Sequence, residues 1–439
     1  MTAASIVAQI TARIIMAMTK EIEELVRNLV GEGVDLYAME QQTFAMLQRI
    51  GQQVIAQVAQ AKDGLQGEVR CERCQRVLCG HSRRRRVLLT LFGSTAVERR
   101  YYYCRSCRWG ECALDRTLKL SRSQVSKALK EVLLVLGAQQ AYGRAARTLE
   151  KVLKVAVSAQ TVLNHMREVG EDVMLKEALE QKLVEQRSYR VPSVVEAPER
   201  LYLGMDATKA HVHGAWRDVK VGLIFAGEAS YDAQGQREAD QAITPMSIAR
   251  LADADSFVSY YRLEAIKRGA LRAKERICLS DAGNWIYDRL KSDFPKLIGI
   301  VDWFHAKDHL ATLSNLLWGE GNEQASVWLE KMKTVLWTQG GKGVVTALQR
   351  SPKLRTHANL DVTAHRDYFV RHQHKMDYPT YRAAGYQIGS GILESNCDVY
   401  VGQRAKLPGM RWKDGLNAVL AVRAHWLNQT FDSCVLPFA

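Results

Sequence analysis

The sequence predicts a multidomain α+β protein, and three observations lead to this prediction. Apolar residues recur every three or four positions in residues 1–64 and again through much of 116–195, which indicates helices. Between these regions, two Cys-x-x-Cys pairs flank two β-type runs, which indicates a metal-bound ribbon. From Glu199 onward, short apolar runs alternate with helical segments, as in an α/β sheet. The 439 residues are also too many for one ordinary core.

The first region, residues 1–64, is expected to form two helices. Ile14, Met18, Ile22 and Leu25 follow one another at helical spacing, and a second apolar series begins after Gly33. A helical hairpin packed on its own domain explains this pattern. A self-association element is the functional alternative, because the spacing is also that of a helix–helix seam.

The second region, residues 65–115, contains four cysteines at the spacing of zinc ligands. Each Cys-x-x-Cys pair brings two thiolates to one cation, and two pairs complete a tetrahedral site. The runs 87–91 and 96–103 are expected to form a hairpin between the pairs. The expected ligands of one structural Zn²⁺ are Cys71, Cys74, Cys104 and Cys107. Alternative ligands are Cys79, His81 and Cys112.

The net charge of +14 indicates a polyanionic partner, most simply nucleic acid. The charge is concentrated around the cysteines, since the segment from Lys62 to Gly110 holds twelve Lys or Arg against four Asp or Glu. DNA-phosphate contacts are expected from Arg83, Arg84, Arg85, Arg86, Arg99 and Arg100. No apolar stretch is long enough to cross a membrane and the first residues lack a secretory pattern, so a cytoplasmic, nucleoid-associated protein is expected.

Residues 116–195 contain two helical patterns that resemble a helix-turn-helix. They cover 145–153 and 157–167, and Ser158 is placed to cap the second helix. A linker is expected at 191–198. Plain packing of two amphipathic helices is the alternative to DNA reading. The residues expected on an outer, base-reading face are Gln160, Thr161, Asn164 and His165.

Acidic residues follow several of the apolar runs in the C-terminal half. The expected strands are 201–205, 219–225, 257–261, 277–280 and 297–301. Asp206 follows the first of them, Asp281 the fourth and Asp302 the fifth. An acid at the carboxyl end of an apolar strand lies at the rim of a sheet, where ligands and metals bind. With Glu394, which follows a Gly-Ser-Gly turn, Asp206 and Asp281 form a set of oxygen donors that suits Mg²⁺ or Mn²⁺.

The order of these three acids resembles the RNase H-like core of bacterial insertion-sequence transposases of the DDE type. In that core the first Asp lies on strand one, the second at the end of strand four, and the Glu on a late helix. The segments 281–287, 302–305 and 388–394 resemble segments of these transposases. Together with the ribbon, they make residues 65–428 similar to the zinc-ribbon-bearing ISKra family.

This resemblance implies an RNase H-like core made of residues 196–309 and 386–439, interrupted by a helical insertion at 310–385. It implies that Asp206, Asp281 and Glu394 hold two Mg²⁺ or Mn²⁺ ions for DNA cleavage and strand transfer. Asp302 is a rival metal ligand, and His305 either orients a phosphate or is structural. Further phosphate contacts are expected from Arg404, Lys406 and Arg411.

The expected partner is double-stranded DNA, both the element's ends and the target. A homodimer or higher homo-oligomer is expected because two ends must be processed. Two other functions are compatible with the same residues. One is a catalytically idle DNA-binding relative of a transposase, and the other is an RNase H-like nuclease that cuts DNA without joining strands.

Overall fold

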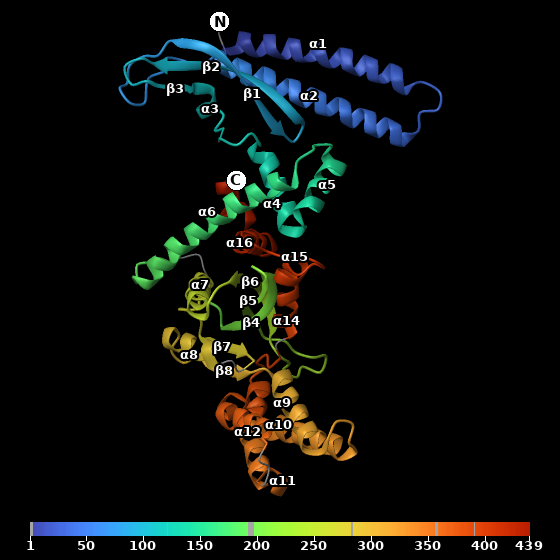
Figure 1. The fold of residues 1–439 in the computed structure, drawn as a ribbon, viewed down its shortest axis with the longest axis vertical. Helices are drawn as coiled ribbons and strands as arrows, with labels where there is room; N and C mark the ends of the chain where they lie inside the picture. Colours follow the sequence, from blue (N-terminus) through green and yellow to red (C-terminus); the bar gives the residue numbers. More distant parts are fainter. Residues whose placement is uncertain (1–2, 121, 192–196, 282–283, 356–358, 390) are drawn as a thin grey trace. The chain divides into compact units, whose positions relative to one another are not determined.

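The computed structural model describes residues 3–120, 122–191, 197–281, 284–355, 359–389 and 391–439 (Figure 1). Contacts divide the chain into two compact units, residues 1–165 with Ala439 and residues 166–438. The boundary falls inside helix α6 (Ala159–Glu185). Most of the predicted linker, residues 192–196, lies outside the described residues.

Unit 1 begins with the two predicted helices, α1 (Ala3–Leu29) and α2 (Leu36–Gly64). Asp35 caps α2, because its side chain accepts a hydrogen bond of 2.8 Å from the backbone N–H of Ala38. Glu21 on α1 binds Arg49 and Gln53 on α2, each at 2.9 Å. These contacts join the helices into a hairpin.

The cysteine-rich region forms a three-stranded antiparallel sheet with the order β1-β2-β3. Its strands are β1 (Gly80–Thr90), β2 (Gly93–Cys104) and β3 (Trp109–Cys112), followed by α3 (Ala113–Thr117). Gly93 supplies the positive φ of 95° at the predicted turn. Ala59 of α2 is buried with Leu88, Val97 and Leu114. The helical hairpin and the ribbon therefore share one small core.

Three helices follow the ribbon: α4 (Lys127–Gln139), α5 (Tyr142–Leu153) and α6. The predicted cap of α6 is confirmed, since the Ser158 hydroxyl accepts a 3.0 Å hydrogen bond from the backbone N–H of Thr161. His165 is buried, so the prediction that it faces outward is wrong. Gln160 and Asn164 are exposed, as predicted.

Unit 2 is built on a mixed five-stranded sheet with the order β6-β5-β4-β7-β8. Strands β4, β5 and β6 pair antiparallel, whereas β4, β7 and β8 pair parallel. The strands are β4 (Arg200–Val212), β5 (Ala215–Glu228), β6 (Gln241–Leu251), β7 (Glu275–Ser280) and β8 (Ile298–Val301). Strand β4 is longer than predicted, so Asp206 lies inside it and not at its end. Only the continuous run of buried residues, 201–205, ends there.

The predicted strand at 257–261 is wrong. These residues belong to α7 (Ala254–Lys267), which begins after the N-cap Asp253. Their β-type aromatic composition reflects burial of one helix face against the sheet, with Phe257 and Tyr261 fully covered. The third strand is instead β6, whose polar residues and Pro245 hid it from prediction. Proline is tolerated there because β6 is an edge strand.

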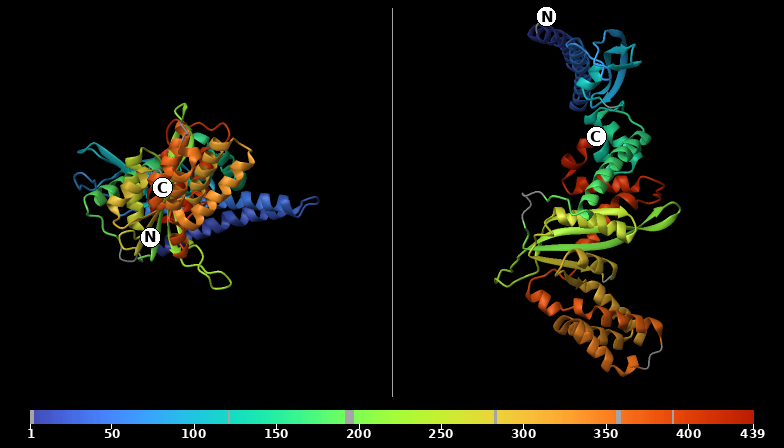
Figure 2. Two further views of the ribbon diagram at one scale, coloured as in Figure 1. Left: turned by 90° about the horizontal axis from the view of Figure 1, so that it is seen from below. Right: turned by 90° about the vertical axis from the view of Figure 1, so that its left-hand side faces the viewer.

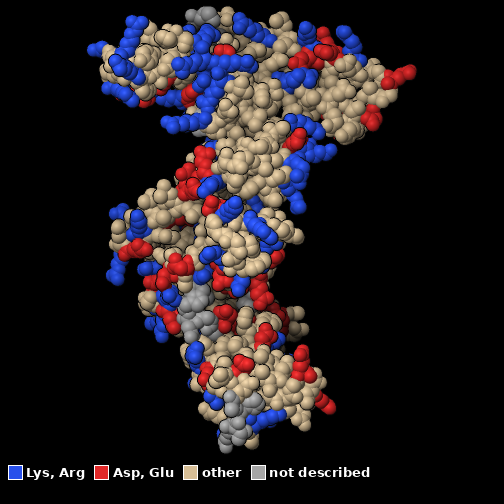
Figure 3. Space-filling model, viewed as in Figure 1, with Lys and Arg blue, Asp and Glu red and all other residues tan. Residues whose placement is uncertain are grey.

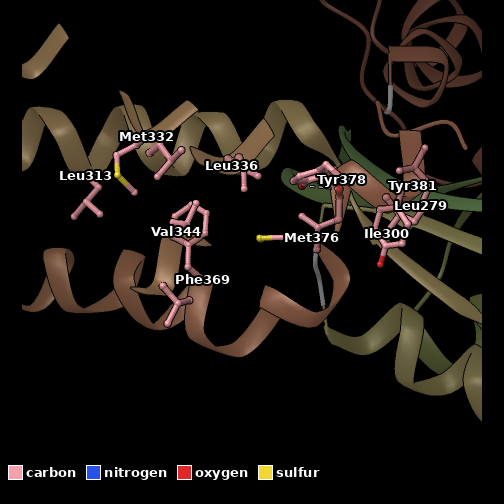
Figure 4. Close-up of a cluster of buried hydrophobic side chains, with 14 of the residues drawn as sticks. Leu279, Ile300, Leu313, Met332, Leu336, Val344, Phe369, Met376, Tyr378 and Tyr381 are labelled. Carbon is pink, nitrogen blue, oxygen red and sulfur yellow. Dashed lines mark hydrogen bonds between the residues drawn. The ribbon is translucent and has the colours of Figure 1, made fainter. Parts of the chain in front are cut away.

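Helix α8 (Asn284–Asp293) precedes β8, and a helical segment then extends from Trp303 to Ala383. Figures 1 and 2 show this segment beyond the β8 edge of the sheet. One hydrophobic cluster joins it to the strands, so that Leu279 and Ile300 lie near Met376, Tyr378 and Tyr381 (Figure 4). Its elements are α9 (Trp303–Trp318), α10 (Glu323–Arg350), α11 (Pro352–Arg355), α12 (Leu360–His372), η1 (Gln373–Lys375) and α13 (Tyr378–Ala383).

The chain returns to the sheet through its last helices. Helix α14 packs on β4, and α16 packs on β6. The elements are α14 (Gly391–Cys397), the π-helical η2 (Asp398–Gly402), α15 (Gln403–Ala405), α16 (Leu416–Leu427), α17 (Phe431–Cys434) and η3 (Leu436–Phe438). Among the described residues, no helix combines the length and the apolar composition that crossing a membrane would require.

Candidate metal centres and nucleic-acid surface

Two tight turns bring the four predicted zinc ligands together. Gln75 and Arg108 each directly follow the second cysteine of a pair, and both adopt positive φ, 60° and 48°. In the first turn, the backbone N–H of Cys71 donates to the carbonyl of Arg76, and that of Gln75 donates back to the carbonyl of Cys71. The chain thereby curls around the sulfur atoms, as a zinc knuckle requires.

The geometry of the four thiols fits zinc. The Sγ atoms of Cys71, Cys74, Cys104 and Cys107 all lie within 4.8 Å of one another. The Sγ atoms of Cys74 and Cys104 are 3.7 Å apart, too far for a disulfide and close to the ~3.8 Å edge of a tetrahedron with Zn–S bonds of about 2.3 Å. The backbone N–H of Arg76, assisted by Cys107, lowers the pKa of the Cys74 thiol to about 7. The Cys₄ cluster is therefore consistent with a zinc ribbon.

The three alternative ligands lie outside this cluster. Cys79 is exposed, and Cys112 is buried but does not join the four sulfur atoms. The His81 ring packs edge-on against Tyr101 and Tyr103. Among the described residues, the ribbon thus offers one tetrahedral set.

Strand register brings the acidic residues of unit 2 together. Gly204 pairs with Leu279 in the parallel β4–β7 ladder, and the same register carried two residues further sets Asp206 beside Asp281. Ser280 pairs with Val301 in the β7–β8 ladder, so the next position sets Asp281 beside Asp302. We call Asp206, Asp281 and Asp302 the acidic row. Neighbouring strands lie about 4.8 Å apart, so the row is compact.

Glu394 and His305 lie next to the acidic row. Oxygen atoms of Asp302 and Glu394 and a ring nitrogen of His305 are within 4.8 Å of one another. Helix α14 packs on β4 and so carries Glu394 to the sheet. Asp302, His305 and Glu394 thus lie at ligand distance from one another, whereas Asp206 and Asp281 do not belong to this set.

Asp302 has a structural role in addition to its place in the row. It is completely buried and caps α9, accepting a 3.1 Å hydrogen bond from the backbone N–H of His305. The same carboxylate oxygen lies 2.8 Å from Nδ1 of His305. This hydrogen bond raises the pKa of His305 to about 8, and the charges of Asp302, Asp281 and Asp206 act in the same direction. The contact with Asp302 thus favours the protonated form of His305.

Two further groups lie at this place, and one of them, Cys397, did not emerge from the sequence. The Cys397 thiol donates a 3.3 Å hydrogen bond to Asp206, and burial together with the Asp206 charge raises its pKa. Lys406, predicted to contact phosphate, is exposed and donates a 2.9 Å hydrogen bond to Thr208, two residues beyond Asp206. No sequence signal marks Cys397, because only folding brings α14 against β4.

The predicted DNA-contacting arginines divide into two groups. Figure 3 shows Lys and Arg side chains gathered over the ribbon. Arg83, Arg84 and Arg85 are exposed on β1, with Arg84 stacked 3.4 Å from the centre of the Tyr101 ring. Arg100 is also exposed.

Arg86 and Arg99 differ from this exposed group, because both are largely buried and pair with Asp115.

The C-terminal basic residues are not equivalent either. Arg411 is exposed. Arg404 is only 1% exposed and packs 5.1 Å from the centre of the Trp412 ring, in a position that does not offer its guanidinium to DNA. The expected phosphate contact of Arg404 does not fit this burial, and the side chain instead packs the last helices.

Comparison with known proteins places the chain in a family. A family model described as "Uncharacterised protein family (UPF0236)" matches residues 29–359, more than half of the chain. The chain belongs to the UPF0236 family. The matched region includes the ribbon, the acidic row and His305, but ends before Glu394.

Two UPF0236 relatives come from Caldanaerobacter subterraneus subsp. tengcongensis. One is named UPF0236 protein TTE2489 and is 25% identical over 167 residues, covering 38% of this chain and 35% of the relative. The other is 25% identical over 167 residues with the same coverage, and its name joins a series of designations from TTE0033 to TTE2212. The chain thus matches about a third of the length of each of these curated relatives.

Proposed function

We propose that this UPF0236 protein is a DNA transposase of the DDE type, similar to those of the zinc-ribbon-bearing ISKra family. The observation that carries the proposal is the acidic row with Glu394 beside it. Asp206 lies on the first strand of the unit 2 sheet, Asp281 directly after the fourth, and Glu394 on a late helix. This is the order of acids in the RNase H-like cores of such transposases.

The residues at the row suit divalent metal ions. Asp206, Asp281 and Glu394 would hold two Mg²⁺ or Mn²⁺ ions, because hard carboxylate oxygens are the ligands these ions prefer. Such ions, when bound, activate the attacking water or 3′-hydroxyl and stabilise the leaving oxygen. Asp302 is already committed to the cap of α9 and to His305, so in this proposal it positions His305 and binds no metal.

Positive groups at the row would handle the DNA backbone. His305, bound to Asp302, and the exposed Lys406, bound to Thr208, lie next to the acids, where protonated His305 and Lys406 would each neutralise a phosphate. In this proposal both hold the scissile strand in line with the acids.

The ribbon and α6 would bind the element's ends. Exposed Arg83, Arg84, Arg85 and Arg100 favour phosphate contacts, whereas the buried pairing of Arg86 and Arg99 favours a structural role. The exposed Gln160 and Asn164 bond to each other at 2.7 Å near the start of α6, so base reading would require them to exchange this contact.

Two other observations support the proposal. The second relative's name joins eleven gene designations from one organism. A protein encoded at many positions in one genome is expected when its gene lies on DNA that moves.

The α1 helix also exposes Ile15, Met16 and Val26 by 52–72%, which favours the expected self-association through the N-terminal hairpin. We place the protein at the nucleoid in the cytoplasm, where its DNA substrates are.

The test is cleavage and joining of a plasmid that carries the gene's native flanking DNA, with Mg²⁺ or Mn²⁺. We expect metal-dependent nicks at the element's ends and strand joining in the wild type. Asp281→Asn should abolish both reactions but keep end binding. Asp288→Asn is the matched control, because this exposed carboxylate lies on α8 and is not among the proposed metal ligands.

Other results of this assay would point to a different function. End binding without cleavage under either metal would identify an idle DNA-binding relative. Cleavage without joining would identify a nuclease. Cleavage that survives Asp281→Asn would refute the assignment of the acidic row.

A further inference from the structure

A cleft of about 800 Å³ opens beside the helical segment of unit 2. This volume lies within the range of roughly 300–1,000 Å³ that is typical of ligand sites. Its walls come from the chain between β5 and β6, from α10, from α13 and from the segment that leads into α14. The lining residues that matter below are Arg237, Trp337, Arg382, Tyr386 and Ile388.

The cleft offers an aromatic surface together with a cation. The Trp337 ring is 38% exposed, although large aromatic rings are usually buried. The Arg382 guanidinium stacks 3.5 Å from the centre of this ring, and the Arg382 side chain is exposed. No carboxylate pairs with Arg382 among the residues that the structure describes. Stacking holds the guanidinium flat while leaving its N–H groups available to an anion.

The other arginine of the cleft is already neutralised. Arg237 pairs with the buried Asp240 and donates to the carbonyls of Ser230 and Glu238. It therefore shapes the wall, and Arg382 is the cation that can bind a ligand. An aromatic ring with a guanidinium stacked on it is a combination that can bind a base, on the ring or on the guanidinium plane, together with its phosphate.

The cleft is connected to the acidic row by a short path. The Trp337 ring packs edge-on against Trp303, with centres 4.9 Å apart. Trp303 directly follows Asp302, and its backbone N–H donates a 2.8 Å hydrogen bond to the carbonyl of Ile388 in the cleft wall. The cleft wall is therefore in contact with the residue that directly follows Asp302.

We propose that this cleft binds an unpaired deoxynucleotide of the DNA strand held at the acidic row, with the base on Trp337 and a phosphate on Arg382. The inference rests on the proposed function, because that function supplies the strand. An unpaired nucleotide is required, since the bases of an intact duplex are stacked on each other and cannot reach a ring inside a cleft. Free nucleotides share this chemistry, so the experiment must separate the two sources.

The test compares two duplexes of the element's end, one blunt and one with a short single-stranded extension that carries 2-aminopurine. Binding of the full-length protein is followed by fluorescence anisotropy without added divalent metal, so that no cleavage occurs. The measured quantity is the ratio of the two dissociation constants, from which the contribution of the ribbon cancels. We expect about tenfold tighter binding of the extended duplex, in keeping with one base–aromatic stack, and quenching of the 2-aminopurine.

Three variants identify the residues. Trp337→Ala should remove the preference, and Trp337→Phe should restore most of it. Arg382→Ala should weaken the preference while leaving the packing of Trp337 on Trp303 intact. Trp426→Ala is the matched control, because Trp426 is also 37% exposed and packs edge-on against a ring, that of Phe431.

The inference is overturned if Trp337→Ala and Arg382→Ala both keep the wild-type ratio. It is also overturned if a free deoxynucleoside monophosphate competes as well as the single-stranded extension does. Neither result depends on catalysis. A wild type that never cuts DNA but shows the Trp337-dependent preference would contradict the proposed transposase activity and leave the cleft assignment standing.

Discussion

Replacing one cysteine of the ribbon should unfold that part of the chain. Cys104 is 4% exposed, and its Sγ lies within 4.8 Å of the other three thiols. Apart from two of the cysteines, the cluster around the zinc site buries Val69, Leu78, Tyr102 and Ala113, while Leu88, Val97 and Leu114 pack separately with Ala59 of α2. At about 1.5–3 kcal/mol for each large apolar side chain, this core contributes less than about 12 kcal/mol.

The free energy of zinc binding is as large as the contribution of this apolar core, or larger. Structural zinc contributes an apparent free energy of about 10–16 kcal/mol to small domains. Cys104→Ser removes one thiolate and should therefore abolish zinc binding and the folding of the ribbon together. Unit 2 has its own cores, so its unfolding transition should remain.

The assay measures zinc per chain by mass spectrometry and unfolding by calorimetry. The wild type should hold one zinc per chain and lose the ribbon transition on chelation. Cys79→Ser is the control, since Cys79 is an exposed ribbon cysteine outside the cluster, and it should behave as the wild type does. A Cys104→Ser protein with one zinc and an unchanged transition would refute the reasoning.

Three predictions concern the stability of unit 2, each measured by chemical denaturation. Tyr202→Phe removes a 2.6 Å hydrogen bond to the buried Asp240 and should cost about 1–3 kcal/mol; an unchanged midpoint would contradict this role. Burial opposes the charge of His425, but its contacts with Cys434 and Glu177 raise its pKa to about 9. The resulting stability is complete below pH 6.5 and is lost as pH rises through about 9, up to about 3 kcal/mol, and His425→Gln should abolish this decline. Gly170→Ala places a Cβ 2.5 Å from a backbone oxygen of α16 and should cost about 1–3 kcal/mol despite better helix propensity; equal or greater stability would show that the helices separate easily.

Local patterns predicted much of the fold correctly. The N-terminal hairpin, the ribbon hairpin with its turn at Gly93, the cap at Ser158 and the helical character of 310–385 all depend on near neighbours in the chain. Periodicity and turn residues report such structure directly. The prediction of a strand at 257–261 failed because the same aromatic composition serves a strand or a buried helix face.

Residue types in the sequence were enough to select the four cysteines that the structure brings together, because few side chains can bind Zn²⁺. The role of the acids in binding Mg²⁺ or Mn²⁺ stays a prediction. Residue types were not enough to say which basic residues are accessible. Arg86, Arg99 and Arg404 are as basic as Arg83, yet the structure buries them against Asp115 or Trp412. Burial is a property of packing between distant segments, so composition alone does not reveal it.

By itself the sequence determined the kinds of element and the chemistry available, because helix period, strand runs and ligand types are local properties of the chain. Only the tertiary structure decided which groups meet. Parallel pairing of β4, β7 and β8 aligned the acidic row, and packing of α14 on β4 added Glu394 and Cys397. The cleft around Trp337 arose in the same way, from the separate segments 237–239, 337–338 and 379–388. Such juxtapositions depend on long-range packing energy, which no short window of sequence contains.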